Sequence, residues 1–406
     1  MLSEQERAAL AAIDGAAMLS HVERWCAINS GSANLDGLAR MADVLGEAFA
    51  AALPGEVERV APAPVEMLRA DGTTASARAG DHLVLRVRPR AERRVLLTGH
   101  MDTVYPADHP FQTLRWVEPG VLNGPGVADM KGGIAVILAA LQAIEAAGVG
   151  DALGYDVLLN SDEEVGSAGS APLIRELAAG KLAALTFEPA MDRDGTLAAA
   201  RPGSGNFSFE VRGRSAHAGR NPHDGRNALV AAADLALRLK AGVRDGLSIN
   251  PARIDGGSPN NVVPDLAILR VNLRPRGPAE LDAAEALIAD ALVHVAAEHQ
   301  VLITRHGGWG RPPKPVTAEA ERLYTLVERA GADLGLEIAR ADSGGVCDGN
   351  NIAACGVPVI DTMGVRGGAI HSPEEYLITD SLSERAGLAA VTLLRLAKDG
   401  LNGGQL

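Results

Sequence analysis

The sequence predicts an α/β protein with a mostly parallel central sheet, helices on both faces of the sheet, and a smaller α+β domain inserted into it. In the first half of the chain, apolar strand-like runs alternate with helical stretches, which is typical of a parallel sheet with crossover helices. Beyond Arg201 the pattern changes to four strand-like segments with two helices. The chain has 406 residues, more than the roughly 250–300 at which one hydrophobic core stops growing. We therefore expect two domains.

The larger domain is expected to be discontinuous, made of residues 1–203 and 312–406. Apolar runs in its first part, each followed by polar residues, are predicted strands, and the long apolar stretch between the first two runs is a predicted helix. After the insertion the same alternation resumes. The predicted strands are 93–98, 155–159, 184–187 and 357–361, and the predicted helices are 131–147, 317–334 and the stretch from Ser381 onward.

The inserted domain is expected to span residues 204–311 and to lead into a proline-rich joint, RPPKPV at 311–316. Two helices among four strands predict an α+β sandwich. The strand-like segments are 207–213, 247–256, 262–276 and 301–306, and the helices are 225–241 and 278–298.

The charge and the cysteine content argue against several classes of protein. A formal net charge of −13 and a pI near 5.3 disfavour nucleic acid or an anionic membrane as the main partner. Cys26, Cys347 and Cys355 are odd in number and lack CxxC spacing, so neither a disulfide framework nor a thiolate zinc site is indicated. The apolar run 134–144 is too short to span a bilayer. The N-terminus does not resemble a secretory signal, and we expect a cytoplasmic protein.

His100 and Asp102 lie two residues apart at the end of the predicted strand 93–98. Alternate residues of a strand share a face, so this spacing suits a metal ligand and a carboxylate that orients it. The alternative is that His100 and Asp102 are both ordinary surface residues. The clusters farther along the chain favour the metal hypothesis.

Asp129 occurs at the mouth of a helix in the glycine-rich segment GPGVADMKGG, residues 124–133. Glycines before a helix can form a phosphate cradle. However, neither GxGxxG nor GxxxxGK(S/T) is met, and the carboxylate of Asp129 would repel phosphate. A metal-binding carboxylate on a tight turn fits better.

Three adjacent carboxylates, Asp162, Glu163 and Glu164, follow the predicted strand 155–159. They repel one another unless they are solvated or neutralised by a cation. An exposed acidic loop is the alternative, but open α/β sheets bind ligands at the carboxyl ends of their strands. One carboxylate could bind a metal while its neighbour stays free as a general base.

Glu188 and His371 each follow a further apolar strand, and neither is informative alone. With them, the strand ends offer two imidazoles and three carboxylates, enough for two divalent cations with one bridging ligand. The set contains no thiolate, so zinc, cobalt and manganese all remain possible. Its members are His100, Asp129, Glu164, Glu188 and His371.

Five motifs in order, GHMD, ADMKGG, SDEEVGS, FEPA and the late GG and HS, resemble the M20 family of metallopeptidases and amidohydrolases. That family includes glutamate carboxypeptidase, acetylornithine deacetylase and succinyl-diaminopimelate desuccinylase. The resemblance extends from about Val95 to His371. It implies a zinc-exopeptidase-like sheet domain, a ferredoxin-like lid, two divalent ions with zinc as the first choice, and a homodimer formed through the inserted domain.

The resemblance also implies a role for each ligand. Asp129 would bridge two metals. His100 and Glu188 would be terminal ligands of different metals, and Glu164 and His371 would complete the sites.

Two further carboxylates receive roles from the same resemblance. Glu163 would be the general base, which takes a proton from a water acidified by two cations and passes it to the leaving amine. Asp102 would fix the tautomer of His100. A solvent-exposed turn residue is the alternative for Asp102.

The inserted segment carries family marks of its own, RGRSAHAGRNPHDGRNAL at 212–229 and GGSPNNVVPD at 256–265. By the resemblance, His217, Asn261 and Arg274 contact substrate. His217 would do so in the active site of the partner subunit, where its ring N–H can stabilise an oxyanion. The alternative for His217 is that it is an ordinary surface residue of a loop. The alternative for Arg274 is that it forms an ordinary ion pair on the face of a strand.

Arg311, in WGRPPK, resembles the arginine with which glutamate carboxypeptidases grip a carboxylate, a task that suits a planar fork. A lysine that some of these enzymes use shortly after the position of Glu188 is missing here, with Thr196 near that place. Arg366 is a possible substitute, and an exposed loop cation is the alternative.

We expect a two-metal hydrolase that cleaves an amide bond in a small peptide or N-acyl amino acid with a free carboxylate, closest to glutamate carboxypeptidase. Val346 and Cys347 precede Asp348 where carboxypeptidase relatives usually have Gly and Thr, which puts glutamate specificity in doubt. An N-acyl amino acid deacylase of the acetylornithine deacetylase or desuccinylase kind is the alternative. A catalytically inert binding protein ranks low, because no ligand is lost and Glu163 is present.

Overall fold

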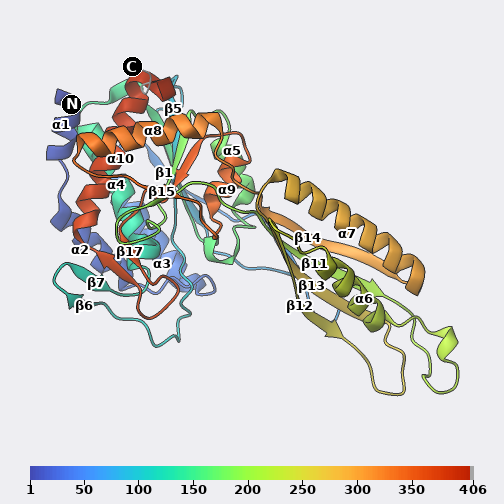
Figure 1. Cartoon of the computed structure of the whole chain (residues 1–406). Coiled ribbons are helices and arrows are strands. Elements are labelled where there is room, and N and C mark those ends of the chain that lie inside the picture. The colour runs from blue at the N-terminus through green and yellow to red at the C-terminus, as the bar shows by residue number, and fades with distance from the viewer. Residues whose placement is uncertain (403–406) are drawn as a thin grey trace.

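A six-stranded sheet lies at the centre of the larger part of the chain in the computed structural model, which describes residues 1–402 (Figure 1). From one edge to the other its strands are β1 (Glu56–Val60), β4 (His82–Val87), β8 (Gly154–Asn160), β5 (Arg94–His100), β9 (Ala183–Thr186) and β16 (Val359–Asp361). The last four pair in parallel, whereas β1 and β4 add antiparallel pairs at one edge. The predicted, mostly parallel sheet is confirmed.

Helices cover both faces of this sheet, because successive strand residues point to opposite sides. Val95 and Leu97 of β5 belong to the core on the face of α1 (Glu4–Ala11), α2 (Gly15–Cys26), α3 (Leu35–Ala52), α4 (Gly133–Ala146), α8 (Ala318–Asp333) and α10 (Asp380–Asp399). Leu96, between them, belongs to the smaller core on the face of α5 (Ala171–Ala178) and α9 (Asp348–Ala353).

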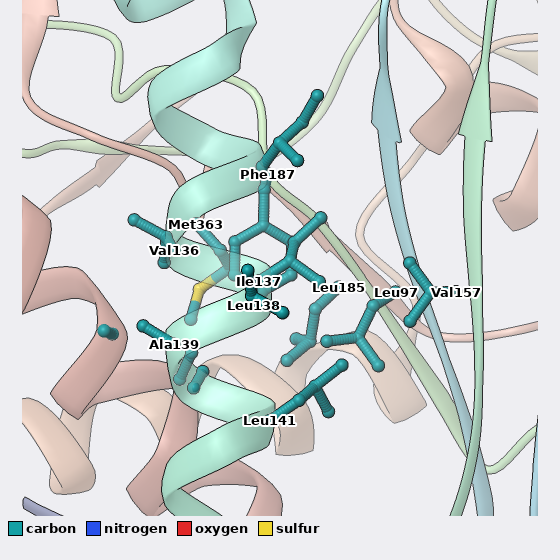
Figure 2. Close-up of a cluster of buried hydrophobic side chains, with 14 of the residues drawn as sticks. Leu97, Val136, Ile137, Leu138, Ala139, Leu141, Val157, Leu185, Phe187 and Met363 are labelled. Atoms are coloured by element: carbon teal, nitrogen blue, oxygen red, sulfur yellow. The ribbon is translucent and has the colours of Figure 1, made fainter. Parts of the chain in front are cut away.

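Helix α4 is the central helix of the larger core. Its residues 133–141 are all buried, and Figure 2 shows its side chains beside Leu97 and Leu185 of the sheet. The helical stretch Val127–Ala146 is long and apolar enough to cross a membrane, but 94% of its apolar window is buried inside the protein. A buried core helix accounts for this composition.

The inserted segment forms a second sheet of four antiparallel strands with its own hydrophobic core. In chain order its elements are β11 (Ser204–Arg212), α6 (Ala228–Ala241), β12 (Leu247–Gly256), β13 (Leu266–Pro275), α7 (Pro278–His299) and β14 (Leu302–Arg311). The sheet order β12-β13-β11-β14 makes this a ferredoxin-like α+β unit, as expected. Figure 1 shows it set apart from the central sheet.

A small four-stranded sheet borders the site described below. It pairs β7 (Val121–Asn123) with β6 (Arg115–Glu118) and with β18 (Tyr376–Ile378), which in turn pairs with β17 (Gly367–Gly368). These strands are too short for an alternating pattern to predict them. Two further pairs of short strands are β2 (Glu66–Leu68) with β3 (Thr74–Ser76), and β10 (Leu197–Ala198) with β15 (Arg340–Ala341).

Candidate metal centre and active site

Three neighbouring parallel strands deliver functional side chains to one edge of the central sheet. His100 is the last residue of β5. Glu163 and Glu164 begin a short turn after β8, and Glu188 follows β9. Because β5 pairs in parallel with both β8 and β9, the carboxyl ends of the three strands meet.

Asp129 lies between the two imidazoles. Its Oδ1 is 3.0 Å from Nε2 of His100, and its Oδ2 is 3.2 Å from Nε2 of His371. The irregular turn Val127–Gly132, directly before α4, holds Asp129. His371 has a φ of +62°, a conformation that is uncommon for residues other than glycine and that concentrates at functional sites. This geometry is compatible with the bridging role predicted for Asp129.

The other two carboxylates divide between the two sides of Asp129. Oε2 of Glu188 is 3.7 Å from Nε2 of His100. Oε2 of Glu164 is 3.2 Å from Nε2 of His371. Glu188 thus lies on the His100 side of Asp129, which favours one shared metal for His100 and Glu188 over the different metals expected.

This group of side chains fits a pair of divalent cations. Its nitrogen and oxygen donors suit zinc, cobalt or manganese. Ligand atoms of His100, Asp129 and Glu164 lie within 4.8 Å of one another, and so do those of His100, Glu163 and Glu188. Oε1 of Glu164 is buried and has no hydrogen-bond partner among residues 1–402, as expected of an atom that binds a cation.

The pKa shifts show how much negative charge is concentrated here. Burial and the charge of Asp129 raise the pKa of Glu164 to about 7. Burial alone would lower the pKa of His100, but neighbouring carboxylates, first among them Glu188, raise it well above its ordinary value. Hydrogen bonds to Asp129 and Glu164 raise the pKa of His371 to about 10. A cluster that draws protons this strongly also attracts divalent cations.

Asp102 is fully buried beside His100. Nδ1 of His100 is hydrogen-bonded to the backbone carbonyl of Asp102 at 2.9 Å, and Oδ1 of the Asp102 carboxylate lies 3.4 Å from the same nitrogen. Its two carboxylate oxygens accept the backbone N–H groups of Glu163, at 3.2 Å, and Glu164, at 3.1 Å. The exposed-turn alternative is therefore wrong. Asp102 is placed to hold both the imidazole ring and the acidic turn.

Glu163 contacts Arg311, the last residue of β14. Nη2 of Arg311 donates to Oε1 of Glu163 at 2.6 Å and to Oγ of Ser167 at 3.0 Å. Burial raises the pKa of Glu163 well above its ordinary value, and Arg311 opposes this rise. The guanidinium of Arg311 thus holds Glu163 in this structure, so its predicted grip on a substrate carboxylate stays a prediction.

Glu375 is a functional residue that the sequence analysis missed. Its fully buried carboxylate accepts the N–H groups of Gly126 at 3.3 Å, Ala128 at 3.0 Å and Asp129 at 3.1 Å. The hydroxyl of Tyr105 donates to the same carboxylate at 2.9 Å. Glu375 therefore fixes the turn that presents Asp129. In the sequence it is one of two adjacent glutamates after His371, a pattern that looks like ordinary surface charge.

A cavity of about 360 Å³ lies beside these residues. It is lined by carboxylates of the cluster, by His371, and by residues of several other segments: Pro189, Ala190, Met191, Arg201, Ser343, Gly345, Val346, Cys347, Thr362, Gly368, Ala369 and Ile370. Thr196 and Arg366 are outside this lining. Arg366 instead donates from Nε and Nη2 to Glu384, at 3.1 and 3.0 Å, so it is a paired cation and not an exposed one.

The residues predicted to bind substrate from the inserted segment are not brought to the cavity in this chain. Ala218 N–H donates to the carbonyl of Asn261, which joins the loop of His217 to the loop between β12 and β13. Figure 1 shows these loops at the end of the inserted unit that is farthest from the central sheet. Arg274, near the opposite end, lines a second cavity of about 390 Å³.

The chain is similar to known proteins in sequence and in fold. The sequence profile described as Peptidase family M20/M25/M40 matches residues 96–395. The chain is 34% identical to carboxypeptidase G2 from Pseudomonas sp. (strain RS-16), over 78% of this chain and 77% of that protein. It is 30% identical to succinyl-diaminopimelate desuccinylase from Xanthomonas oryzae pv. oryzae, over 74% of this chain and 83% of that protein.

Among solved structures, the fold is similar to that of the Bacillus subtilis YXEP protein, described as a dinuclear metal binding peptidase from the M20 family. The TM-score is 0.65 at 15% identity, covering 95% of this chain and 98% of the other. The family match spans most of the chain, and the solved structure shares its fold. The chain therefore belongs to the M20/M25/M40 family of peptidases, as a metallohydrolase of the M20 type.

Proposed function

We propose that this chain is a two-metal hydrolase that cleaves an amide bond in a small peptide or N-acyl amino acid with a free carboxylate, in the manner of a glutamate carboxypeptidase. The observation that carries the proposal is the position of Asp129, with one carboxylate oxygen toward His100 and the other toward His371. A single carboxylate between two imidazoles suits a bridge between two cations.

Five residues would hold the ions, which we propose to be zinc, with cobalt or manganese as substitutes. One side is His100 with Glu188, the other is His371 with Glu164, and Asp129 serves both. When bound, the cations would act as Lewis acids toward the scissile carbonyl and lower the pKa of the attacking water.

Glu163 is the general base in this proposal. Its carboxylate takes a proton from the attacking water and later delivers it to the nitrogen of the leaving amine. Arg311 holds this carboxylate in place. Asp102 orients His100 and, through the backbone N–H of Glu163, the base itself.

The relatives bear on which amide is cleaved. Similarity to carboxypeptidase G2 favours removal of a C-terminal amino acid. Similarity to succinyl-diaminopimelate desuccinylase supports a second candidate, an N-acyl amino acid deacylase. Both activities release an amine from an amide beside a carboxylate, so the same residues serve either one.

We propose further that the chain acts as a homodimer through the inserted unit. His217 and Asn261 lie on exposed loops at the outer end of that unit. They reach a metal centre only if it belongs to a partner subunit. In that arrangement the ring of His217 would stabilise the oxyanion, while Arg274 would approach substrate from its own chain.

A hydrolysis screen tests the proposal. The protein is reconstituted with zinc, cobalt or manganese and assayed on N-acyl amino acids and dipeptides, with Glu163→Ala as the blank. We expect release of free amino acid by the wild-type chain but not by the blank. Failure on every substrate at saturating metal would support the inert alternative instead.

A further inference from the structure

Arg201 is the only arginine or lysine among the described residues that line the cavity beside the proposed metal centre. Arg201 is 6% exposed, and its side chain is firmly held. Nε donates to Oδ2 of Asp361 at 2.8 Å, and Nη1 donates to Oγ of Ser343 and to the carbonyl of Gly345, both at 3.2 Å. Nη2 has no partner within residues 1–402. One edge of a fixed guanidinium therefore remains for a ligand.

The charges around Arg201 do not balance. Its partner Asp361 is fully buried and is shared with Lys314, whose Nζ is 3.3 Å from the same Oδ2. Taken by itself, this group of two buried cations and one carboxylate carries a surplus positive charge, while the carboxylates of the proposed metal centre line the same cavity. A buried charge is costly unless an anion compensates it. The nearby Glu188 is committed to the proposed metal centre.

The other two arginines near the site, Arg311 and Arg366, do not line this cavity. Arg311 is paired with Glu163 through Nη2, whereas its Nη1 is buried without a partner among the described residues. Arg366 is paired with Glu384 through two nitrogens. Arg201 is thus the arginine that can offer a free N–H group to a ligand in this cavity.

A second cavity of about 390 Å³ adjoins the first, and both share Arg201 and Ser343 as lining residues. Its wall also includes Arg244, Arg274 and Arg276, together with Asp342 and with Asp245, which pairs with Arg276. This gathering of arginines stands out in a chain with a net charge of −13. It adds a positive field on the side of Arg201 and attracts an anionic group.

We propose that Arg201 binds the side-chain carboxylate of an acidic amino acid in the substrate and so determines specificity. The inference rests on the proposed function. No other arginine or lysine is among the described residues that line the cavity, and a guanidinium with a free edge suits a carboxylate. The preferred substrates are therefore N-acyl or peptidyl derivatives of glutamate or aspartate.

The test compares two substrates of the same shape, an N-acyl-glutamate and the matching N-acyl-glutamine. The zinc-loaded wild-type protein should prefer the glutamate derivative in kcat/KM by about 10- to 100-fold, as expected for one charge-assisted contact. Arg201→Met should abolish the preference through KM, and Arg201→Lys should keep part of it. Arg366→Met is the matched control and should leave the preference unchanged.

A binding measurement covers the case in which Arg201→Met fails to fold. Calorimetric titration of the folded wild-type and Arg201→Lys proteins with free glutamate and with glutamine should give tighter glutamate binding, weakened about 10-fold by the lysine. Equal kcat/KM for the two substrates, or a preference that survives in Arg201→Met, would overturn the assignment while leaving amide hydrolysis intact. If neither substrate is cleaved, the proposed function fails. In that case the calorimetric measurement still tests Arg201, because equal binding of glutamate and glutamine would overturn its role.

Discussion

Nη2 of Arg311 lies 2.6 Å from Oε1 of Glu163, and both side chains are buried. Arg311 is the last residue of β14, whereas Glu163 follows β8 of the central sheet. The final strand of the inserted unit is thereby joined directly to the proposed general base. A change in the position of the inserted unit would therefore change the position of the Glu163 carboxylate.

Replacing Arg311 by Met should lower kcat by about 10- to 100-fold, because the proposed base loses its positioning partner. Arg311→Lys keeps the positive charge but loses the planar guanidinium, and it should retain more activity than Arg311→Met. Steady-state kinetics decide the outcome. A rise in KM at unchanged kcat would show instead that Arg311 grips the substrate.

Glu375→Gln should weaken metal binding by about 10- to 100-fold, as is typical when a residue that orients a ligand is altered. The Glu375 carboxylate accepts the backbone N–H groups of Ala128 and Asp129. The side-chain amide of glutamine would place its own N–H donors among these backbone donors. Tyr105→Phe removes a single donor to Glu375 and is the milder matched variant. Competition with a chromophoric chelator measures the affinity, and an unchanged affinity in Glu375→Gln would contradict the account.

Metal stoichiometry distinguishes the bridge from the terminal ligands. The wild-type chain should bind two zinc ions, His371→Ala about one, and Asp129→Ala essentially none, because Asp129 faces both sides. Atomic spectroscopy after gel filtration gives the count. Two ions retained in Asp129→Ala would exclude the bridge.

We expect the stability of the folded chain to depend on pH through Glu6, which lies far from the site. Burial alone would raise its pKa, but hydrogen bonds from the N–H of Ser3 and from Arg395 lower it below the ordinary 4.5. The folded state therefore gains stability above pH 4.5 and loses it as the pH falls further. Glu6→Gln should cost about 1–2 kcal/mol at pH 7 and less at pH 3, because the carboxylate becomes increasingly protonated below pH 4.5.

Urea unfolding at the two pH values measures this difference. Glu4→Gln, an exposed change in the same helix, is the control and should have little effect at either pH. An equal loss for Glu6→Gln at both pH values would rule out the ionic explanation.

The sequence was sufficient to predict the parallel strands and to bring five candidate ligands to one place. The reason is topological, since the strands that carry His100, Glu164 and Glu188 are parallel neighbours and their polar ends must meet. The α+β character of the inserted unit followed from its four strand-like segments and two helices, whereas its ferredoxin-like arrangement was implied by the family resemblance.

Contacts between distant segments could not be predicted in the same way. Glu375 is 247 residues from Ala128, and Arg311 is 148 residues from Glu163. Nothing in their local sequence distinguishes these side chains from surface charges. The surplus charge at Arg201 likewise depends on three segments that meet only in the folded chain, so it became visible only with the structure.

The central claim is that Glu163 moves the proton while five other side chains hold the metals. It is tested most directly by measuring kcat and metal content together in Glu163→Ala. The account predicts two ions per chain, an unchanged fold, and a kcat reduced by at least about 1,000-fold. A Glu163→Ala protein that keeps its metals and turns over substrate at a rate near wild type would contradict it.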